Sequence, residues 1–134
     1  MIIKCGANLD VSDGSGWTPL HHACQNGDLE TVKNLVANEA NIHAFSNKHL
    51  YPLHIAALNN HAHLITFLAE NGADLECQND EQCTPLLLAA KKGHIESVKT
   101  LLDLGADIYA LDIRKWNALH YASYNSFELQ LKIP

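Results

Sequence analysis

Histidine and cysteine side chains come close together near the start of the chain. In the stretch TPLHHACQNG, His21 and His22 are followed by Cys24. Imidazole nitrogens and thiolates are common zinc ligands, and a thiol beside an imidazole can act as a nucleophile with its base. The stretch also begins with Thr18 and Pro19, which are typical of the first turn of a helix. The residues alone therefore allow a metal site, a catalytic pair or a helix start.

The same stretch returns three times, in steps of 33 residues. The copies are TPLHHA at 18–23, YPLHIA at 51–56, TPLLLA at 84–89 and NALHYA at 117–122. A second motif keeps the same step, with GANL at 6–9, EANI at 39–42, GADL at 72–75 and GADI at 105–108. Two motifs that hold one period over four copies establish an internal repeat.

Each repeat predicts two short helices. Thr18 and Thr84 can cap a first helix whose first position holds a proline. Apolar residues at helical spacing then predict a second helix, with Leu29, Val32, Leu35 and Val36 in one copy, Leu64, Ile65 and Leu68 in the next, and Ile95, Val98, Leu101 and Leu102 in the third. Gly72 and Gly105 follow this helix, where a positive φ is needed. Glu39 stands at the same place, so we expect a strained turn there.

These motifs resemble the ankyrin repeat, whose unit is a β-turn plus two helices with a T-P-L-H-x-A signature. The resemblance covers the chain from about residue 3 to residue 127. It implies an all-α solenoid of stacked helix-turn-helix units with β-hairpin loops. We expect a single ankyrin-repeat domain over residues 1–134, which divides into the end of a truncated preceding repeat at 1–12, repeats at 13–45, 46–78 and 79–111, and an incomplete final repeat with an irregular tail at 112–134.

The resemblance also implies a structural role for the recurring histidine. His21, His54 and His120 would form hydrogen bonds within and between adjacent repeats, and Leu87 replaces the histidine once. That replacement should cost about one hydrogen bond, roughly 1 kcal/mol. A metal ligand or catalytic base that recurs once per repeat would lack partners. We therefore expect no catalytic residue, no metal ligand and no cofactor.

Three further features could suggest chemistry. His61 and His63 form an H-x-H pair, but residues i and i+2 of a helix face different ways, and we expect His61 to cap the second helix. Cys77 and Cys83 lie on one hairpin and are expected to be free thiols. The stretch SDGSGW lacks the G-K-[ST] of a phosphate-binding loop, so it is assigned to the first hairpin tip.

Composition narrows the possible partners. The 134 residues are 47% hydrophobic and carry a formal charge of −6. This charge does not provide the basic surface that binding to nucleic acid or to an anionic membrane would need. No apolar run reaches the roughly 20 residues that span a bilayer, and the first residues do not resemble a secretory signal. The four cysteines have no paired spacing. We expect an intracellular protein, cytoplasmic or nuclear, that binds neither nucleic acid nor membrane.

The resemblance implies that a partner protein binds at the hairpin tips and in the concave groove of the first helices. Transferred by register, the partner-binding candidates are Trp17, Gln25, Asn26, Lys48, Leu50, Leu58, Asn59, Lys91, Lys92, Arg114, Trp116 and Tyr124. Trp17, Leu50, Cys83 and Trp116 would form an apolar column along the groove. For the tryptophans, partner binding and packing against neighbouring hairpins both stay open. Basic residues on the groove side predict a partner segment with apolar anchors and some acidic character.

Both ends depart from the repeat. Ile2 and Ile3 match Leu35 and Val36, which indicates that the chain opens inside the last turn of an earlier second helix. At the other end, FELQLKIP alternates apolar and polar residues, as a strand does. This tail could be disordered, a helix with a poor apolar face, or a segment unrelated to the repeat, and we expect it to be irregular after about residue 126. Without polar caps, apolar terminal faces could self-associate.

The sequence thus predicts a non-enzymatic scaffold for protein–protein interaction. The alternative is a targeting or regulatory segment of a larger enzyme, channel or ubiquitin-ligase adaptor. An enzyme in its own right would need a reactive constellation, which we do not find, and a purely structural spacer would show no groove preference for any partner.

Overall fold

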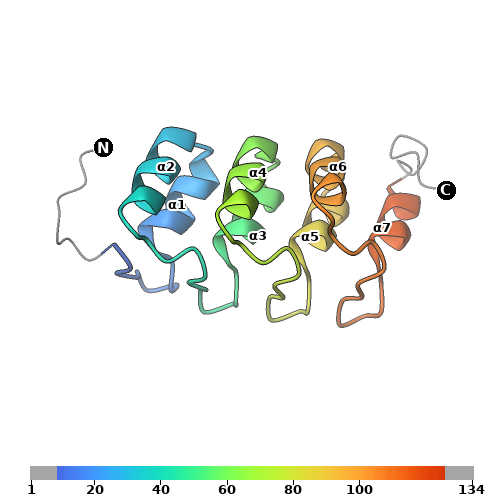
Figure 1. Cartoon of the computed structure of the whole chain (residues 1–134). Helices are drawn as coiled ribbons and strands as arrows, with labels where there is room; N and C mark the ends of the chain where they lie inside the picture. The colour runs from blue at the N-terminus through green and yellow to red at the C-terminus, as the bar shows by residue number, and fades with distance from the viewer. Residues whose placement is uncertain (1–8, 126–134) are drawn as a thin grey trace.

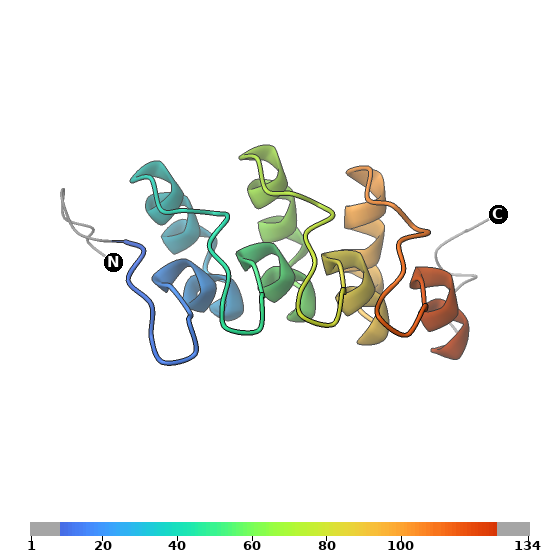
Figure 2. The same ribbon diagram turned by 90° about the horizontal axis from the view of Figure 1, so that it is seen from below.

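The computed structural model describes residues 9–125, in which seven α-helices are joined by loops. The helices are α1 (Pro19–Asn26), α2 (Leu29–Ala37), α3 (Pro52–Leu58), α4 (Ala62–Glu70), α5 (Pro85–Lys91), α6 (Ile95–Asp103) and α7 (Ala118–Tyr124). They stack in two rows, α1, α3, α5 and α7 in one and α2, α4 and α6 in the other (Figure 1). The loops lie side by side along one edge of the stack (Figure 2). The all-α repeat fold is confirmed.

The first helix of each repeat starts as its sequence predicts. The side chain of Thr18 accepts a hydrogen bond from the His21 backbone N–H at 3.4 Å, and Thr84 accepts one from Leu87 at 3.3 Å. Asn117 does the same for His120 at 3.0 Å. These bonds satisfy N–H groups that have no partner inside the helix.

The loops are turns, because no residue in the described range is a strand residue; the expected β-hairpins are in this respect wrong. One backbone bond spanning four residues closes each loop, as between Asp13 N–H and the Trp17 carbonyl at 2.9 Å. A polar side chain at the loop start also accepts two backbone N–H bonds, namely Asp13, Ser46, Asn79 and Asp112 in successive repeats. A second backbone bond forms the turn inside each loop, as between Gly16 N–H and the Asp13 carbonyl at 2.9 Å, and these two bonds are too little pairing for a strand.

The apolar core runs through the whole stack. Leu20, Leu53 and Leu86 occupy one position of successive first helices, and all three are buried. Ala56 and Ala89 let neighbouring helices approach closely and are also buried. Each helix pair therefore buries its apolar side against the next pair rather than within itself.

Histidines link the repeats as the resemblance implies. The Tyr51 N–H donates to Nδ1 of His54 at 3.0 Å, which places the ring proton on Nε2, and Nε2 donates to the Cys83 carbonyl at 2.9 Å. His21 likewise reaches the Leu50 carbonyl at 2.7 Å. Leu87 is buried at the third position and offers no such bond. Within the described chain, Nε2 of the exposed His120 has no partner.

A second pair of histidines crosses between repeats at the other end of the helices. Nε2 of His61 bonds the Gln25 carbonyl at 3.1 Å, and His94 bonds the Leu58 carbonyl at 3.0 Å. The expectation that the His61 side chain caps its own helix is wrong, since it makes no cap bond there. Gly27, with φ 73°, makes room for this ring, because a Cβ would lie 2.6 Å from His61 Cε1.

The loop tips are also joined through their backbones. Asn47 N–H donates to the Ser15 carbonyl at 3.0 Å, Asp80 N–H to Lys48 at 3.1 Å, and Ile113 N–H to Glu81 at 3.0 Å. Main-chain atoms thus set the spacing between tips, and the Asn47 side chain adds a bond to the Gly14 carbonyl at 3.0 Å.

Several sequence interpretations concern the two ends of the chain. The interpretations of Ile2, Ile3 and Cys5, and of the tail after residue 126, lie outside the described residues. On the outer side of α1, the exposed His22 pairs with Asp13 at 2.9 Å, where Ile55, Leu88 and Tyr121 are buried in later repeats. This face of α1 therefore combines the polar His22 and Asp13 with the exposed apolar Val11, and self-association through the ends stays a prediction. No helix within residues 9–125 is long and apolar enough to cross a membrane.

The predicted strain after α2 is present. Glu39 adopts φ 70°, whereas Gly72 and Gly105 adopt 98° and 103° at the same register. A side chain in this left-handed region costs about 1 kcal/mol.

Replacing Glu39 by Gly should raise the free energy of unfolding by about 1 kcal/mol, because Gly adopts a positive φ without steric cost. Urea denaturation followed by circular dichroism measures the change. Glu39→Gln keeps the strained backbone and removes the charge, so it should remain close to wild type. Equal stabilisation by both variants would assign the effect to charge and contradict the strain.

Candidate functional site

The predicted partner-binding residues fall into two groups by burial. Trp17, Leu50, Leu58 and Trp116 are partly buried and pack against the core. The others are exposed, and these are Gln25, Asn26, Lys48, Asn59, Lys91, Lys92, Arg114 and Tyr124. The backbone carbonyls of Gln25 and Leu58 are already occupied by His61 and His94, so only the side chains at these helix ends are available.

One group of candidates lines a hollow between the first two loops. The hollow has a volume of about 380 Å³, and Trp17, Lys48 and Leu50 lie on its wall beside Ser15 and Asn47. It joins an indole face, an aliphatic side chain and an ammonium group. Such a mixture can hold an apolar side chain with an acidic neighbour.

A second group gathers on the last loop and α7. The guanidinium of Arg114 lies 5.6 Å from the centre of the Trp116 ring, and the Tyr124 ring meets Trp116 edge-on at 6.0 Å. Arg114 also donates to the Tyr121 hydroxyl at 2.8 Å. Tyr124 is 77% exposed, so this aromatic and cationic cluster presents a large surface to a partner.

The cluster rests on Asp112, which is buried beneath it. Tyr121 donates its hydroxyl to this carboxylate, and the backbone N–H groups of Arg114 and Trp116 donate to it at 2.8 and 3.1 Å. Burial alone would raise the pKa of Asp112, but these hydrogen bonds outweigh it and lower the pKa. The carboxylate therefore stays charged and fixes the loop that carries Arg114 and Trp116.

The apolar column predicted along the groove is interrupted. Cys83 is buried rather than exposed, so it separates Leu50 from Trp116. Burial raises the pKa of its thiol to about 11, with Asp112 and Glu81 adding to the rise and Lys91 and Arg114 opposing it.

Cys77 and His54 form the closest approach to a thiol–imidazole pair, with Sγ 3.8 Å from Nδ1. Burial raises the pKa of Cys77 to about 12 and lowers that of His54 to about 4. A nucleophilic pair needs the opposite shifts, towards thiolate and imidazolium. Nδ1 is moreover occupied by the Tyr51 N–H. These two groups are parts of the core.

Metal and redox chemistry find no support in the described side chains. Within residues 9–125, no group of three or more His, Cys, Asp or Glu side chains is placed to hold a metal ion. The rings of His61 and His63 lie 6.2 Å apart and steeply inclined, as their spacing predicts. Cys24, Cys77 and Cys83 are buried free thiols.

Sequence reasoning missed an aromatic cluster on the second loop. Phe45 stacks on His49 at 4.1 Å, and Tyr51 lies 5.5 Å from Phe45. Two signals could have indicated it. Tyr51 stands where Thr18 and Thr84 cap their helices, and the loop gathers three rings in seven residues.

A family model described as ankyrin repeats (3 copies) matches residues 1–79 and again residues 53–131. A comparison with curated proteins found no match.

The shifted pKa of His54 predicts a pH-dependent stability. The unfolded chain binds a proton at this ring below about pH 6.5, whereas the folded protein does so only below about pH 4. Stability contributed by the neutral ring is therefore present above pH 6.5 and lost as the pH falls towards 4. Between pH 7 and pH 5, the free energy of unfolding of His54→Leu should fall by about 2 kcal/mol less than that of the wild type. Urea denaturation at each pH measures both.

His120→Leu is the matched control, because His120 stands at the same register and is exposed. This variant should follow the pH dependence of the wild type. If the free energy of unfolding of His54→Leu changed with pH as that of the wild type does, the buried ring would not be the source of the pH dependence.

Proposed function

The chain belongs to the ankyrin-repeat family, and on that premise we propose that it is a non-enzymatic scaffold that binds a partner protein through its loop tips and groove. Ankyrin repeats are generally protein–protein interaction modules. A stack of this kind presents an extended surface with little rearrangement, because each repeat is held by its neighbours. The proposal includes an intracellular location, cytoplasmic or nuclear.

The observation that carries the proposal is the cluster in which Tyr124 of α7 meets Arg114 and Trp116 on the loop fixed by buried Asp112. Trp, Tyr and Arg are the residue types that dominate binding energies at interfaces. Nothing in the fold requires the Tyr124 ring, which is 77% exposed. A rigid loop with an exposed aromatic side chain loses little entropy on binding.

Charge indicates what the groove would prefer. Lys48, Lys91, Lys92 and Arg114 are all exposed on the predicted groove side. Acidic side chains lie exposed along and after the second helices, for example Asp28, Glu70 and Asp103. A partner segment with apolar anchors and acidic side chains fits the groove best.

Capture from a cell lysate, followed by identification of the bound protein, supplies the partner. Trp116→Ala combined with Leu50→Ala should abolish its capture, since both anchors are removed. Because Trp116 packs against the core, Tyr124→Ser provides a second variant that leaves the core intact, and it should weaken binding about tenfold. Circular dichroism checks that every variant is folded.

With the partner identified, Lys91→Glu combined with Lys92→Glu should slow association several-fold at low salt. Lys33→Glu combined with Lys99→Glu is the matched control, because these exposed lysines lie on α2 and α6, in the other helix row. Stopped-flow or surface plasmon resonance gives the rates. An unchanged association rate and affinity in the groove variant would contradict the assignment of the groove.

A further inference from the structure

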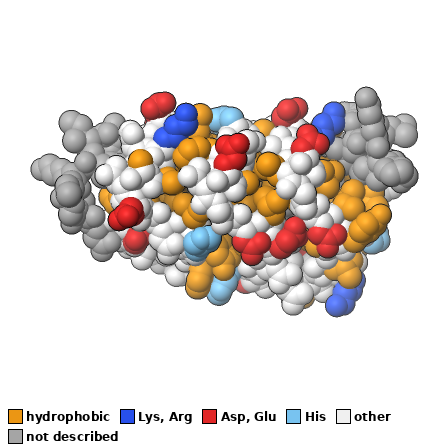
Figure 3. Space-filling model, in the orientation of Figure 1, with side chains coloured by type: hydrophobic (Ala, Val, Ile, Leu, Met, Phe, Trp, Pro, Cys, Tyr) orange, Lys and Arg blue, Asp and Glu red, His pale blue; other side chains and the backbone are white. Residues whose placement is uncertain are grey.

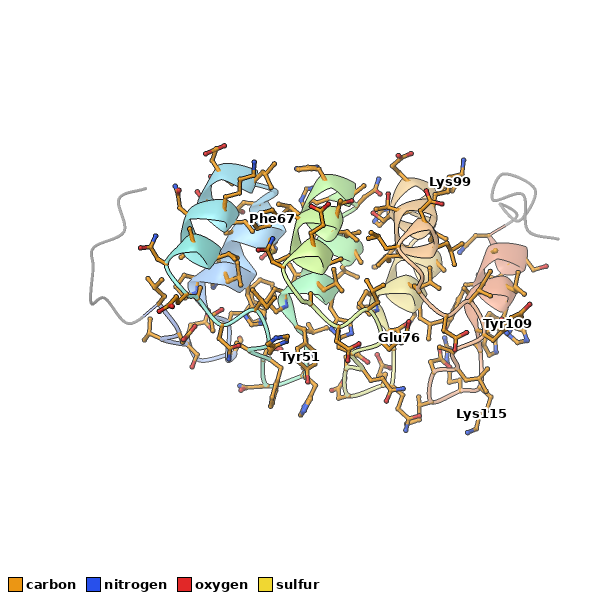
Figure 4. All side chains as sticks on the ribbon, in the orientation of Figure 1. Tyr51, Phe67, Glu76, Lys99, Tyr109 and Lys115 are labelled. Atoms are coloured by element: carbon orange, nitrogen blue, oxygen red, sulfur yellow. The ribbon has the colours of Figure 1, made fainter. Side chains whose placement is uncertain are left out.

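The loops carry a second exposed surface, on the face seen in Figures 3 and 4. Its centre is the aromatic cluster of Phe45, His49 and Tyr51 on the loop before α3. Phe45 is 50% exposed and stacks nearly parallel on His49, with ring centres 4.1 Å apart. Tyr51 completes the cluster at 5.5 Å from Phe45. An exposed aromatic stack of this kind is a marker of an interaction site.

Tyr51 departs from the repeat in a way that the fold does not require. Thr18, Thr84 and Asn117 cap the first helix at this register, while the Tyr51 side chain makes no cap bond. Loss of an N-cap lowers the stability of a helix. A partly exposed residue that breaks a local rule at a cost in stability is typical of a functional position.

A cavity opens directly beside this ring. It has a volume of about 460 Å³ and lies between the second and third loops. Ile42, Leu53, Ala73 and Tyr51 form the apolar part of its lining, and His43 and Gln78 add polar side chains. Asp74 is part of the lining and is itself exposed, so a carboxylate stands at the rim. The cavity can therefore take an apolar side chain whose neighbour carries a positive charge.

Three carboxylates continue from the cavity towards the next repeat. The Glu76 N–H donates to Asp74 Oδ1 at 2.9 Å, and the Asp107 N–H donates to Glu76 Oε2 at 2.9 Å. These bonds hold the three side chains in a row. All three are exposed.

No cation of the described chain compensates this row. Between residues 9 and 125 the one ion pair is that of His22 with Asp13, which is remote from the row in sequence. In Figure 3 the acidic band lies beside the hydrophobic and histidine cluster, and Lys and Arg side chains appear only towards the upper edge and the lower right corner. Figure 4 shows Tyr51, Glu76 and Tyr109 in order along the molecule, on the loops before α3, α5 and α7. Exposed Tyr109 and Leu111 follow beyond the acidic row.

We propose that this outer loop surface, made of Phe45, His49, Tyr51, Asp74, Glu76 and Asp107, binds a protein segment in which arginine alternates with apolar side chains. Arginine combines the two contacts that the surface offers, because its guanidinium stacks on aromatic rings and pairs with carboxylates. The apolar side chain fills the cavity. The surface is opposite in charge to the groove, so it goes beyond the proposed function and recognises a different class of segment.

The repeats themselves supply substitutions that the fold accepts. Gln78 stands at the register of Phe45, Asn41 at that of Asp74, and Thr84 at that of Tyr51. The three variants are therefore Phe45→Gln, Asp74→Asn and Tyr51→Thr. Asn41 already accepts the same turn bond, from the His43 N–H at 2.9 Å, so Asp74→Asn removes charge without removing the turn. Tyr51→Thr restores a helix cap and should not lower stability.

The probe is a fluorescein-labelled hexapeptide of alternating arginine and leucine, and fluorescence anisotropy measures its binding to the full chain. We expect saturable binding that weakens as salt is raised. Each single variant should weaken it at least fivefold, and Asp74→Asn combined with Tyr51→Thr at least twentyfold. Lys91→Glu combined with Lys92→Glu should not weaken it, since those residues lie at the groove.

Several results would overturn the proposal. These are the absence of saturable binding, equal binding of a glutamate–leucine hexapeptide, and wild-type affinity in the combined variant. If the variant with Lys91→Glu and Lys92→Glu lost peptide binding and the surface variants did not, the peptide would bind in the groove instead. Sedimentation that shows a dimer broken by Phe45→Gln would assign the surface to a second copy of the chain.

Discussion

A two-helix unit of about thirty residues cannot bury its own apolar side, and the whole structure depends on that constraint. Leu53 and Ala56 are buried because a repeat stands on each side of α3. Once stacking is obligatory, the polar groups at the stacking plane must find partners across it, since a buried unpaired group would be costly. Histidine meets this need twice at the plane between repeats 46–78 and 79–111, through His54 to Cys83 and through His94 to Leu58.

The same constraint explains how the surfaces can diverge. Asp13, Ser46, Asn79 and Asp112 each hold a loop by the same two backbone bonds, although their side chains differ in charge and size. Loop shape is thus kept while the neighbouring positions vary. On the last loop they form the Arg114 and Trp116 cluster, and on the second loop they form the Phe45 and Tyr51 stack. The same repeat framework can therefore carry two binding surfaces of opposite charge.

The sequence predicted what the repeat period controls. The helix starts at Thr18 and Thr84, the buried leucines, the bonds of His21 and His54, and the left-handed turn at Glu39 all follow from register. The period does not say which way a side chain turns once two repeats are packed. His61 therefore reached across to Gln25 instead of capping its own helix, and Cys83 was buried although its neighbours in the column are only partly so. The aromatic cluster was missed because Phe45 and His49 meet through a turn that spacing alone does not define.

The backbone bonds between loop tips have a consequence for how such a molecule could change its specificity. The amide of Asn47 is tied to the carbonyl of Ser15, that of Asp80 to Lys48, and that of Ile113 to Glu81, so no tip side chain is needed for these links. Exchanging those side chains leaves these backbone links in place and removes only the bond that the Asn47 side chain adds to the Gly14 carbonyl. Substitutions at the loop tips, natural or engineered, can therefore change which ligand is bound while the spacing of the loops stays the same.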